Sequence, residues 1–295
     1  MKAINLTLDW AVNTMHSGFL MALEHGLYKN AGIDLEIKGS AEGETLTSGS
    51  DFICAPQASY TLGLAENKTQ GLTAIASITQ TNDSGIVSLK KEGITSPKQL
   101  MGKRLTHWNQ DWFHAVLEQV VAEDGGDYKE VIKVPMDVEH IVETLQTKAD
   151  ATWVYKSWEY FELIDAGHEV NYFSFPQQNP VFDYCSPALF VQNSLRNENP
   201  QLVRSFLAAT EKGYQLAKAN PREAVEYLAK RRPEVSQPLW EASQNYISNI
   251  YLDEQGHWGR ISPERWNNFD NWMIEKNLVA KEQVIQGSGF TNEYF

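Results

Sequence analysis

The sequence predicts an α/β protein of two lobes, in which mostly parallel sheets are flanked by helices and the chain ends in a helical tail. Strand-like and helix-like segments alternate with short loops from residue 4 to residue 191, which is typical of parallel sheets covered by helices. Helix-like segments alone follow. The 295 residues suffice for two lobes. Because no glycine-serine linker separates them, we expect the chain to cross twice between a first lobe, residues 1–89 and 185–295, and a second lobe, residues 90–184.

The strands are predicted from short apolar runs and from alternation. Ile33-Asp34-Leu35-Glu36-Ile37 alternates apolar and polar residues, which is typical of a half-buried strand. Asp51-Phe52-Ile53-Cys54-Ala55 is a short apolar run, which is typical of a buried strand. The strands we expect cover residues 4–8, 33–37, 51–55, 72–78, 86–89, 104–108, 131–134, 151–155, 170–173 and 187–191.

The helices are predicted from apolar spacing and from their start signals. Residues 19–29 place Phe19, Leu20, Leu23 and Leu27 on one side of a helix. A capping residue followed by proline predicts a helix start, and this pair occurs at Ser96, Asn199, Asn220 and Ser262, with a weaker version at Ser236. We also expect helices over residues 59–65, 112–123, 137–147 and from 157 to before 167, the last three capped by Asp111, Asp137 and Ser157.

The composition argues against several classes of partner and site. A net charge of −13 disfavours nucleic acid and anionic membrane surfaces, and no run approaches the about 20 apolar residues of a membrane span. The two cysteines, Cys54 and Cys185, form no CxxC motif, so we expect reduced, buried thiols and no metal site. Met1-Lys2-Ala3 leads directly into a strand; the expected location is extracytoplasmic if a signal peptide was removed, and cytoplasmic if Met1 is the native start.

A dense group of polar and aromatic residues follows the first strand. Asp9, Trp10, Asn13 and His16 lie between that strand and the next helix, where α/β proteins bind small ligands. Trp10 could stack on a heteroaromatic ring, Asp9 could accept hydrogen bonds from an amine, and Asn13 and His16 could bond ring nitrogens. The alternatives are a core tryptophan, a loop carboxylate and a structural histidine.

Further candidates lie at later strand ends. Tyr155, Trp158 and Glu159 follow the strand 151–155; we expect Glu159 to bind an amidine-like edge and the two aromatic residues to stack, the alternative being a core tryptophan and a solvated glutamate. Trp108 and Asn109 are weaker candidates in a loop. Tyr184, at the second crossing, is expected to line the cleft between the lobes. Cys185 has no identifiable histidine partner, so we expect no catalytic role.

The chain resembles the pyrimidine-precursor family of thiamine metabolism. The resemblance rests on Leu8-Asp9-Trp10 with Asn13 and His16, on 26–36 (Gly-Leu-Tyr, then Gly-Ile-Asp-Leu-Glu), on 48–52 (Ser-Gly-Ser-Asp-Phe), and on the ending 290–295 (Phe-Thr-Asn-Glu-Tyr-Phe). It spans the whole chain in order. It implies a two-lobed periplasmic binding protein fold of the second type, and one of two activities: an aminopyrimidine-binding component of an ABC importer, or the fungal-type pyrimidine synthase, which consumes pyridoxal phosphate and one of its own histidines with iron near a cysteine-rich run.

This chain departs from the synthase pattern at three places. Only Cys185 remains of the cysteine-rich run, Tyr60 stands near the place of the consumed histidine, and 108–112 (Trp-Asn-Gln-Asp-Trp) replaces the glycine-containing phosphate loop. Phosphate binding needs close backbone N–H groups and a cation, whereas this loop offers two indoles and a carboxylate. The family's usual proline is Val12 here, which bears on the shape of the first loop.

The prediction is therefore a monomeric solute-binding protein without cofactor, metal or catalytic residue. It would capture a small heteroaromatic, a thiamine-related aminopyrimidine, in a cleft between the lobes and deliver it to an ABC permease. The alternatives are a divergent pyrimidine synthase, or a binding protein for another flat aromatic or sulfonate solute.

Overall fold

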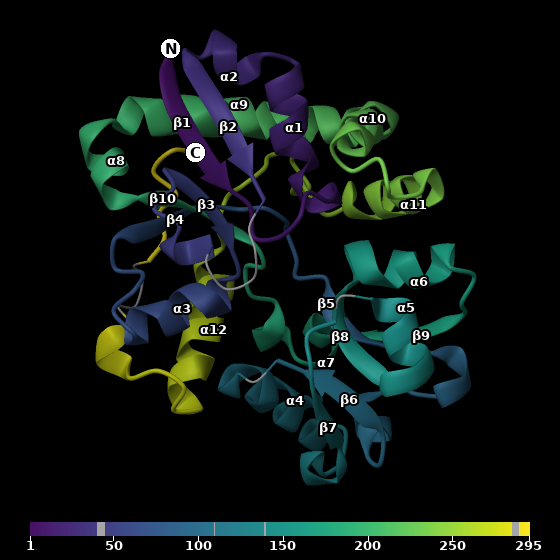
Figure 1. The fold of residues 1–295 in the computed structure, drawn as a ribbon. Helices are drawn as coiled ribbons and strands as arrows, with labels where there is room; N and C mark the ends of the chain where they lie inside the picture. Colours follow the sequence, from purple (N-terminus) through teal and green to yellow (C-terminus); the bar gives the residue numbers. More distant parts are fainter. Residues whose placement is uncertain (40–44, 109, 139, 285–288) are drawn as a thin grey trace. The chain divides into compact units, whose positions relative to one another are not determined.

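A computed structural model describes residues 1–39, 45–108, 110–138, 140–284 and 289–295. The chain divides into two compact units, a first unit of Met1–Thr81 and Tyr184–Phe295 and a second unit of Asn82–Asp183. Each contains a five-stranded mixed sheet flanked by helices (Figure 1), as the predicted fold class requires.

The sheet of the first unit has the strand order β2-β1-β3-β10-β4. Its strands are β1 (Lys2–Thr7), β2 (Ile33–Lys38), β3 (Phe52–Ala55), β4 (Leu72–Ser77) and β10 (Ala188–Gln192). β1 pairs in parallel with β2 and β3, and β10 lies antiparallel between β3 and β4. Four strands therefore run in one direction and end at the same edge.

Alternation along the strands of this sheet separates two cores. Phe52 and Cys54 belong to the core shared with helices α1 (Ser17–Glu24) and α9 (Pro200–Ala219), whereas Ile53 and Ala55 face the core of α3 (Gln57–Ala65) and α12 (Pro263–Glu275). Successive strand residues point to opposite faces, so both faces of the sheet are covered (Figure 1).

The helical tail supplies most of this covering. It contains α8 (Asn193–Glu198), α9, α10 (Pro221–Arg231), α11 (Gln237–Ile247) and α12. Helices α9, α10 and α12 begin at the predicted prolines. The helix expected over residues 19–29 is instead two helices, α1 and α2 (Leu27–Asn30), because Gly26 between them adopts a left-handed conformation with φ of 68°.

The sheet of the second unit has the order β7-β6-β8-β5-β9. Its strands are β5 (Ser84–Leu89), β6 (Arg104–His107), β7 (Ile132–Pro135), β8 (Ala151–Tyr155) and β9 (Val170–Ser174). Helices α4 (Asp111–Glu123), α5 (Ile141–Glu143), α6 (Phe161–Asp165) and α7 (Phe175–Gln178) accompany it. The helix expected over 137–147 forms only from Ile141 and continues as a π-helix, Thr144–Lys148.

The expected lobe boundaries need correction. The segment 86–89 was assigned to the first lobe, but β5 is hydrogen-bonded between β8 and β9 and so belongs to the second unit. Tyr184, assigned to the second lobe, belongs to the first unit. A buried strand needs a partner on each side, and no local pattern says which sheet supplies it.

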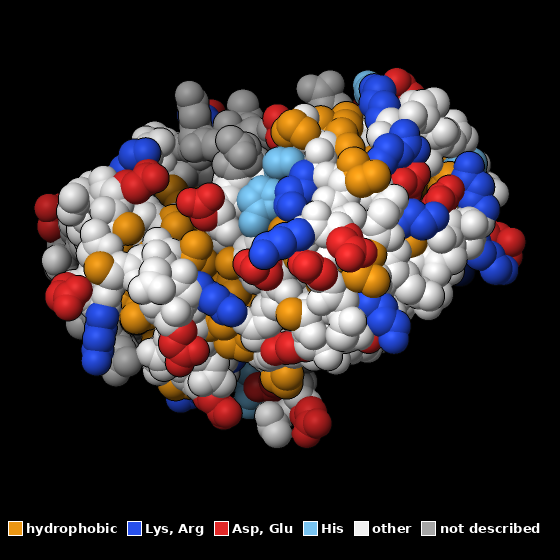
Figure 2. Space-filling model, turned by 90° about the horizontal axis from the view of Figure 1, so that it is seen from below, with side chains coloured by type: hydrophobic (Ala, Val, Ile, Leu, Met, Phe, Trp, Pro, Cys, Tyr) orange, Lys and Arg blue, Asp and Glu red, His pale blue; other side chains and the backbone are white. Residues whose placement is uncertain are grey.

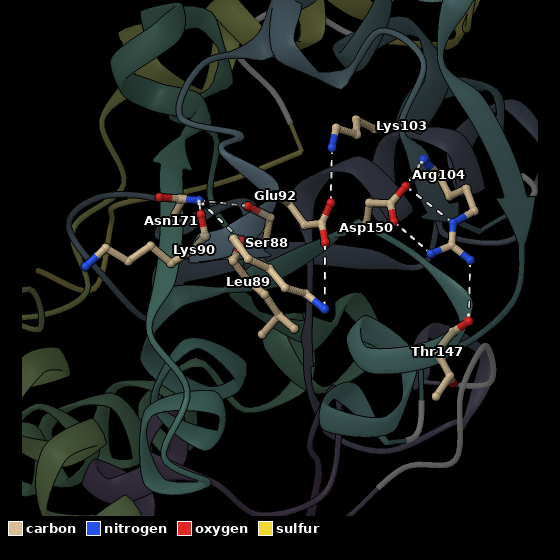
Figure 3. Close-up of polar contacts among 10 residues, drawn as sticks. Ser88, Leu89, Lys90, Glu92, Lys103, Arg104, Thr147, Asp150 and Asn171 are labelled. Carbon is tan, nitrogen blue, oxygen red and sulfur yellow. Dashed lines mark hydrogen bonds and ion pairs between the residues drawn. The ribbon is translucent and has the colours of Figure 1, made fainter.

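The edge of the second sheet where β6 and β8 begin is closed by polar contacts (Figure 3). The Arg104 guanidinium donates to both oxygens of Asp150, at 2.7 and 3.3 Å, and Lys103 pairs with Glu92 at 3.0 Å. The amide of Asn171 donates to the Leu89 carbonyl and to Ser88 Oγ, each at 3.4 Å. These groups satisfy one another, and the candidate residues lie at the opposite edge.

Candidate functional site

In each unit the candidate residues lie at the carboxyl edge of the sheet, where its parallel strands end. Asp9 and Trp10 follow β1 in the first unit, and Trp108 and Tyr155 lie at the ends of β6 and β8 in the second. Ligands of open α/β sheets bind outside the carboxyl ends of the strands. The structure thus provides one such edge in each unit.

The loop after β1 is held in place by hydrogen bonds with β2 and with the helical tail. The Leu8 N–H donates to the Lys38 carbonyl at 2.8 Å. The Tyr214 hydroxyl donates to the Met15 carbonyl at 2.8 Å, and the Arg232 guanidinium donates to the Val12 carbonyl at 3.3 Å. These contacts fix the backbone on both sides of Trp10, so the indole is presented by an ordered loop.

Asp9, Asn13 and His16 form one hydrogen-bonded group. The Asn13 N–H donates to His16 Nδ1 at 3.2 Å, and His16 Nε2 lies 2.8 Å from Asp9 Oδ1. Because Nδ1 accepts an N–H, the ring proton is on Nε2 and is donated to the carboxylate. The Asn13 side chain caps the short helix Thr14–His16 by accepting the Met15 N–H at 2.8 Å.

This arrangement separates the roles of the four residues. His16 is fully buried, with 0% of its surface exposed, and both ring nitrogens are engaged, so its position orients Asp9 rather than offering a nitrogen to a ligand. Asp9 keeps about a quarter of its side chain exposed, at 24%. Trp10 is 39% exposed, so it lies at the surface and is not the core tryptophan that the sequence analysis gives as the alternative.

In the second unit, Trp108 belongs to a cluster of aromatic rings packed edge-on and tilted against one another. Its ring contacts Phe113 at 5.4 Å and Trp153 at 6.1 Å between centroids, and Trp153 packs on Phe175 at 4.0 Å. The cavity beside Trp108 and Trp153 measures about 10 Å³, room for about one water molecule. Asn109 lies outside the described residues.

Glu159 lies in the turn that follows β8. Its Oε2 accepts the Tyr155 N–H at 3.0 Å. The pKa of Glu159 is raised to about 7; burial is the main cause, the neighbouring carboxylates Glu162 and Asp83 add to the rise, and the Tyr155 N–H opposes it. A carboxylate with a perturbed pKa at the edge of a sheet is a typical functional-site residue. Tyr155 beside it is half-buried.

The remaining two candidates are buried in their own units. Trp158 is 9% exposed. The ring of Tyr184 is 1% exposed and stacks on Phe269 at 4.2 Å between centroids. It therefore packs in the interior of the first unit, whereas the sequence analysis expects it to line a cleft. An aromatic residue at the point where the chain passes from one unit to the other can point to the surface or to the interior. The sequence does not show which, because the packing partner of Tyr184 lies on α12, far away along the chain.

Sequence reasoning missed Asp83, the residue before β5. It is 3% exposed and accepts the Ser157 N–H at 2.8 Å through Oδ2, in the turn that also holds Glu159. The signal was the polar run Asn82-Asp83-Ser84 directly before an apolar strand, but the strand was expected to begin only at Ile86.

The surface and the cysteines are unremarkable for a globular protein. Figure 2 shows acidic and basic side chains interspersed with apolar ones on the visible face. Cys54 and Cys185 are both free and buried.

Among the residues that the structure describes, no helix is long and apolar enough to cross a membrane.

Comparison with known sequences finds binding proteins and one enzyme. The formylaminopyrimidine-binding protein of Halalkalibacterium halodurans is 24% identical over 96% of this chain and 89% of its own length. The 4-amino-5-hydroxymethyl-2-methylpyrimidine phosphate synthase of Legionella pneumophila is 24% identical over 88% of this chain and 84% of its own. The riboflavin-binding protein RibY of Chloroflexus aurantiacus is 22% identical over 100% of this chain and 86% of its own.

Comparison with solved structures confirms the predicted periplasmic binding protein fold. The alkanesulfonate-binding protein SsuA of Xanthomonas axonopodis pv. citri superposes with a TM-score of 0.74 at 11% identity, covering 98% of each chain. The nitrate-binding protein NrtA of Synechocystis superposes with a TM-score of 0.70 at 14% identity, covering 95% of this chain and 83% of its own.

The family model described as "NMT1/THI5 like" matches residues 13–224, well over half of the chain. The expected relation to the pyrimidine-precursor proteins of thiamine metabolism is thereby confirmed, since both an aminopyrimidine-binding protein and a pyrimidine phosphate synthase are among the relatives. This chain belongs to the NMT1/THI5-like family and has the periplasmic binding protein fold.

Proposed function

We propose that this protein is a solute-binding protein that captures a small, flat heteroaromatic of the aminopyrimidine class and delivers it to an ABC importer. The observation that carries the proposal is an aromatic residue beside a carboxylate at the carboxyl edge of each sheet: Trp10 with Asp9, and Tyr155 with Glu159. The formylaminopyrimidine-binding relative, similar along nearly the whole chain, supports the same class of ligand. Its work would take place outside the cytoplasm, as a monomer.

In this mechanism each unit contributes one stacking surface and one hydrogen-bond acceptor. Trp10 stacks on the ring, which stabilises the complex by about 1 kcal/mol beyond the burial of area. Asp9, oriented by His16, accepts an N–H from the polar edge of the ligand, and Glu159 accepts another. Contacts that a ligand makes in only one conformation of the protein favour that conformation, so binding shifts its population.

Titration with hydroxymethyl-aminopyrimidine tests the ligand class. We expect a saturable change in tryptophan fluorescence, and by calorimetry we expect Trp10→Ala to weaken binding by roughly tenfold. Trp10→Phe is the matched control, because it keeps an aromatic face and should retain most of the affinity. Absence of any response at millimolar ligand would exclude this class of solute. Mass spectrometry of small molecules released from the denatured protein then identifies what is bound.

The pyrimidine phosphate synthase relative favours an enzyme as the second candidate. Two features of this chain support binding instead. Tyr60, near the place of the consumed histidine, is 3% exposed and packs on Phe190 at 4.7 Å in the core of the first unit. Cys185 is 0% exposed. Formation of a pyrimidine product from pyridoxal phosphate by the purified protein would reverse the ranking.

A sulfonate is the third candidate, because a sulfonate-binding protein shares the fold. That likeness concerns the fold alone. The carboxylates at the two sheet edges, Asp9, Asp83 and Glu159, would repel an anionic group, which supports a neutral or cationic ligand. Calorimetry with an alkanesulfonate should therefore show no binding under conditions where the aminopyrimidine binds.

A further inference from the structure

His107 and His114 lie against each other in the second unit, and neither belongs to the proposed ligand site. His107 is the last residue of β6, and His114 lies in the first turn of α4 (Figure 1). Their ring centroids are 4.6 Å apart, with 61° between the ring planes. Six residues separate them in the sequence, a spacing that matches no common metal motif, so only the fold brings the pair together.

Each ring has one nitrogen that is held by an oxygen. His107 Nδ1 lies 3.1 Å from the Trp108 carbonyl, which only accepts, so Nδ1 carries the proton and Nε2 has a lone pair. His114 Nδ1 lies 2.8 Å from the Tyr128 hydroxyl. Because a hydroxyl accepts as well as donates, His114 can adopt the same tautomer. Among the described residues neither Nε2 atom has a hydrogen-bond partner.

Histidines that bind metal ions are held in this way. Such a histidine ligates the ion through one nitrogen of the neutral ring and donates its other N–H to an oxygen, which fixes the orientation of the ring. Burial, with smaller contributions from His107 and Lys133, lowers the pKa of His114. The neutral form, which can ligate, is therefore favoured near neutral pH. His107 is 8% exposed and His114 is partly exposed, so the pair reaches the surface of the unit.

The spacing of the two rings suits a single ion. A metal ion lies about 2.0–2.1 Å from a ligating imidazole nitrogen, hence about 3.2 Å from the centre of the ring. Two rings bound at about 90 to 110° around one ion then have centres about 4.5 to 5.2 Å apart, and the pair is at 4.6 Å. Edge-to-face packing alone also gives about 4.5 to 7 Å, but it does not require an oxygen on both Nδ1 atoms.

The charges around the pair favour a cation. Asp111, three residues before His114 on α4, raises the pKa of His114, and Glu118, four residues after it, raises the pKa of Tyr128. Residues at these spacings share a face of a helix, and both carboxylates are exposed. Lys133 opposes them, with its Nζ 4.5 Å from the centroid of the Tyr128 ring. Two carboxylates against one ammonium leave an excess of negative charge beside two neutral rings.

We propose that His107 and His114 form a binding site for a divalent transition-metal ion, with Nε2 of each ring as a ligand. Imidazole suits Cu²⁺, Ni²⁺ and Zn²⁺, and the usual order of affinities places Cu²⁺ first. Among the described residues no third histidine, cysteine or carboxylate completes the pair, so water occupies the remaining positions. A bound ion joins the end of β6 to the start of α4 and fixes both ends of the connection that carries Trp108.

Titration of the full chain with CuCl₂, after removal of metals by EDTA, tests the site. We expect calorimetry to show one equivalent of Cu²⁺ bound, more tightly than Ni²⁺ or Zn²⁺. The electron paramagnetic resonance spectrum of this complex should show coupling to two imidazole nitrogens. Copper bound through a single nitrogen, or spread over several weak sites, would overturn the proposal.

Two variants locate the ion. His114→Ala removes one ligand and should weaken Cu²⁺ binding by at least about tenfold, and Tyr128→Phe removes the oxygen that holds Nδ1 and should weaken it by roughly tenfold. His168→Ala is the control, because it removes a partly exposed histidine of the same unit and should leave the affinity unchanged. Unchanged affinity in both variants, or an equal loss in the control, contradicts the assignment. The spectrum of the unaltered protein decides the question even if a variant does not fold.

This site is independent of the proposed function, and the two can fail separately. If copper binds as expected and the aminopyrimidine does not bind, the metal site stands and the proposed ligand class is wrong. If the aminopyrimidine binds and the copper spectrum shows no pair of imidazole nitrogens, the metal site is wrong and the binding function stands.

Discussion

The ionisation of Glu159 should make the protein less stable as the pH rises from about 5 to 8. Burial raises the pKa of this carboxyl from 4.5 to about 7 in the folded chain. Below pH 4.5 it is protonated whether the chain is folded or unfolded. Between the two values the unfolded chain loses the proton first, so the folded state binds more protons and the free energy of unfolding falls as pH rises.

The size of this effect follows from the same values. At about 1.4 kcal/mol for each pH unit, the rise from 4.5 to about 7 corresponds to about 3 kcal/mol. Part of the side chain still reaches solvent, so we expect about 2 kcal/mol. Glu159→Gln keeps an oxygen for the Tyr155 N–H and cannot ionise. It should therefore match the unaltered protein near pH 4.5 and exceed its stability by about 2 kcal/mol at pH 8.

Urea unfolding of both proteins at a series of pH values measures this difference. Tryptophan fluorescence is a suitable signal, because Trp158 directly precedes Glu159 and Trp153 lies in the core of the same unit. Glu130→Gln, which removes a charge from an exposed position of the same unit, serves as the control, since an exposed substitution usually changes stability by less than about 0.5 kcal/mol. A difference for Glu159→Gln that does not grow with pH, or a variant less stable at pH 8, would refute the reasoning.

Two further predictions concern the first unit. Gly213→Ala should lower the free energy of unfolding by about 2 kcal/mol or more, because the added Cβ would lie 2.0 Å from the Gly18 carbonyl oxygen, where α9 crosses α1. The control is Gly71→Ala, whose Cβ would meet its nearest atom at 3.9 Å and should change the urea midpoint little. Equal shifts of the urea midpoint in the two variants would contradict this prediction. Asp270→Asn should raise the free energy of unfolding by about 2 kcal/mol at pH 8 and leave it unchanged at pH 4. Burial raises the pKa of Asp270 from 3.8 to about 6, so the folded protein is destabilised at pH 8 by an ionised, buried carboxylate, whereas the amide is neutral and its oxygen can still accept the Thr61 hydroxyl. A loss of stability of the variant at pH 8 would show that the carboxylate is needed.

Much of the candidate site could be predicted from the sequence, but not how each residue is used. The position of Trp10 after the first strand predicted an indole that stacks on a ligand ring; its side chain is 39% exposed, which excludes the core alternative, and the stacking role stays a prediction. His16 was given the same kind of role, yet it is fully buried between Asp9 and the Asn13 N–H. Both residues occur in the same polar loop, and only the fold of that loop decides which one faces solvent.

The residue pattern alone determined the α/β class, the elements of both sheets and the starts of the tail helices, because alternation and capping signals act over a few neighbouring residues. Tertiary structure decided that 84–89 joins the second sheet, since β5 is placed by pairing with β8 and β9, which lie some 60 to 90 residues further along the chain. It also decided that Asp83 binds the N–H of Ser157, in the turn that holds Glu159. Such contacts depend on which distant segments bury each other's surfaces, and no local pattern contains that information.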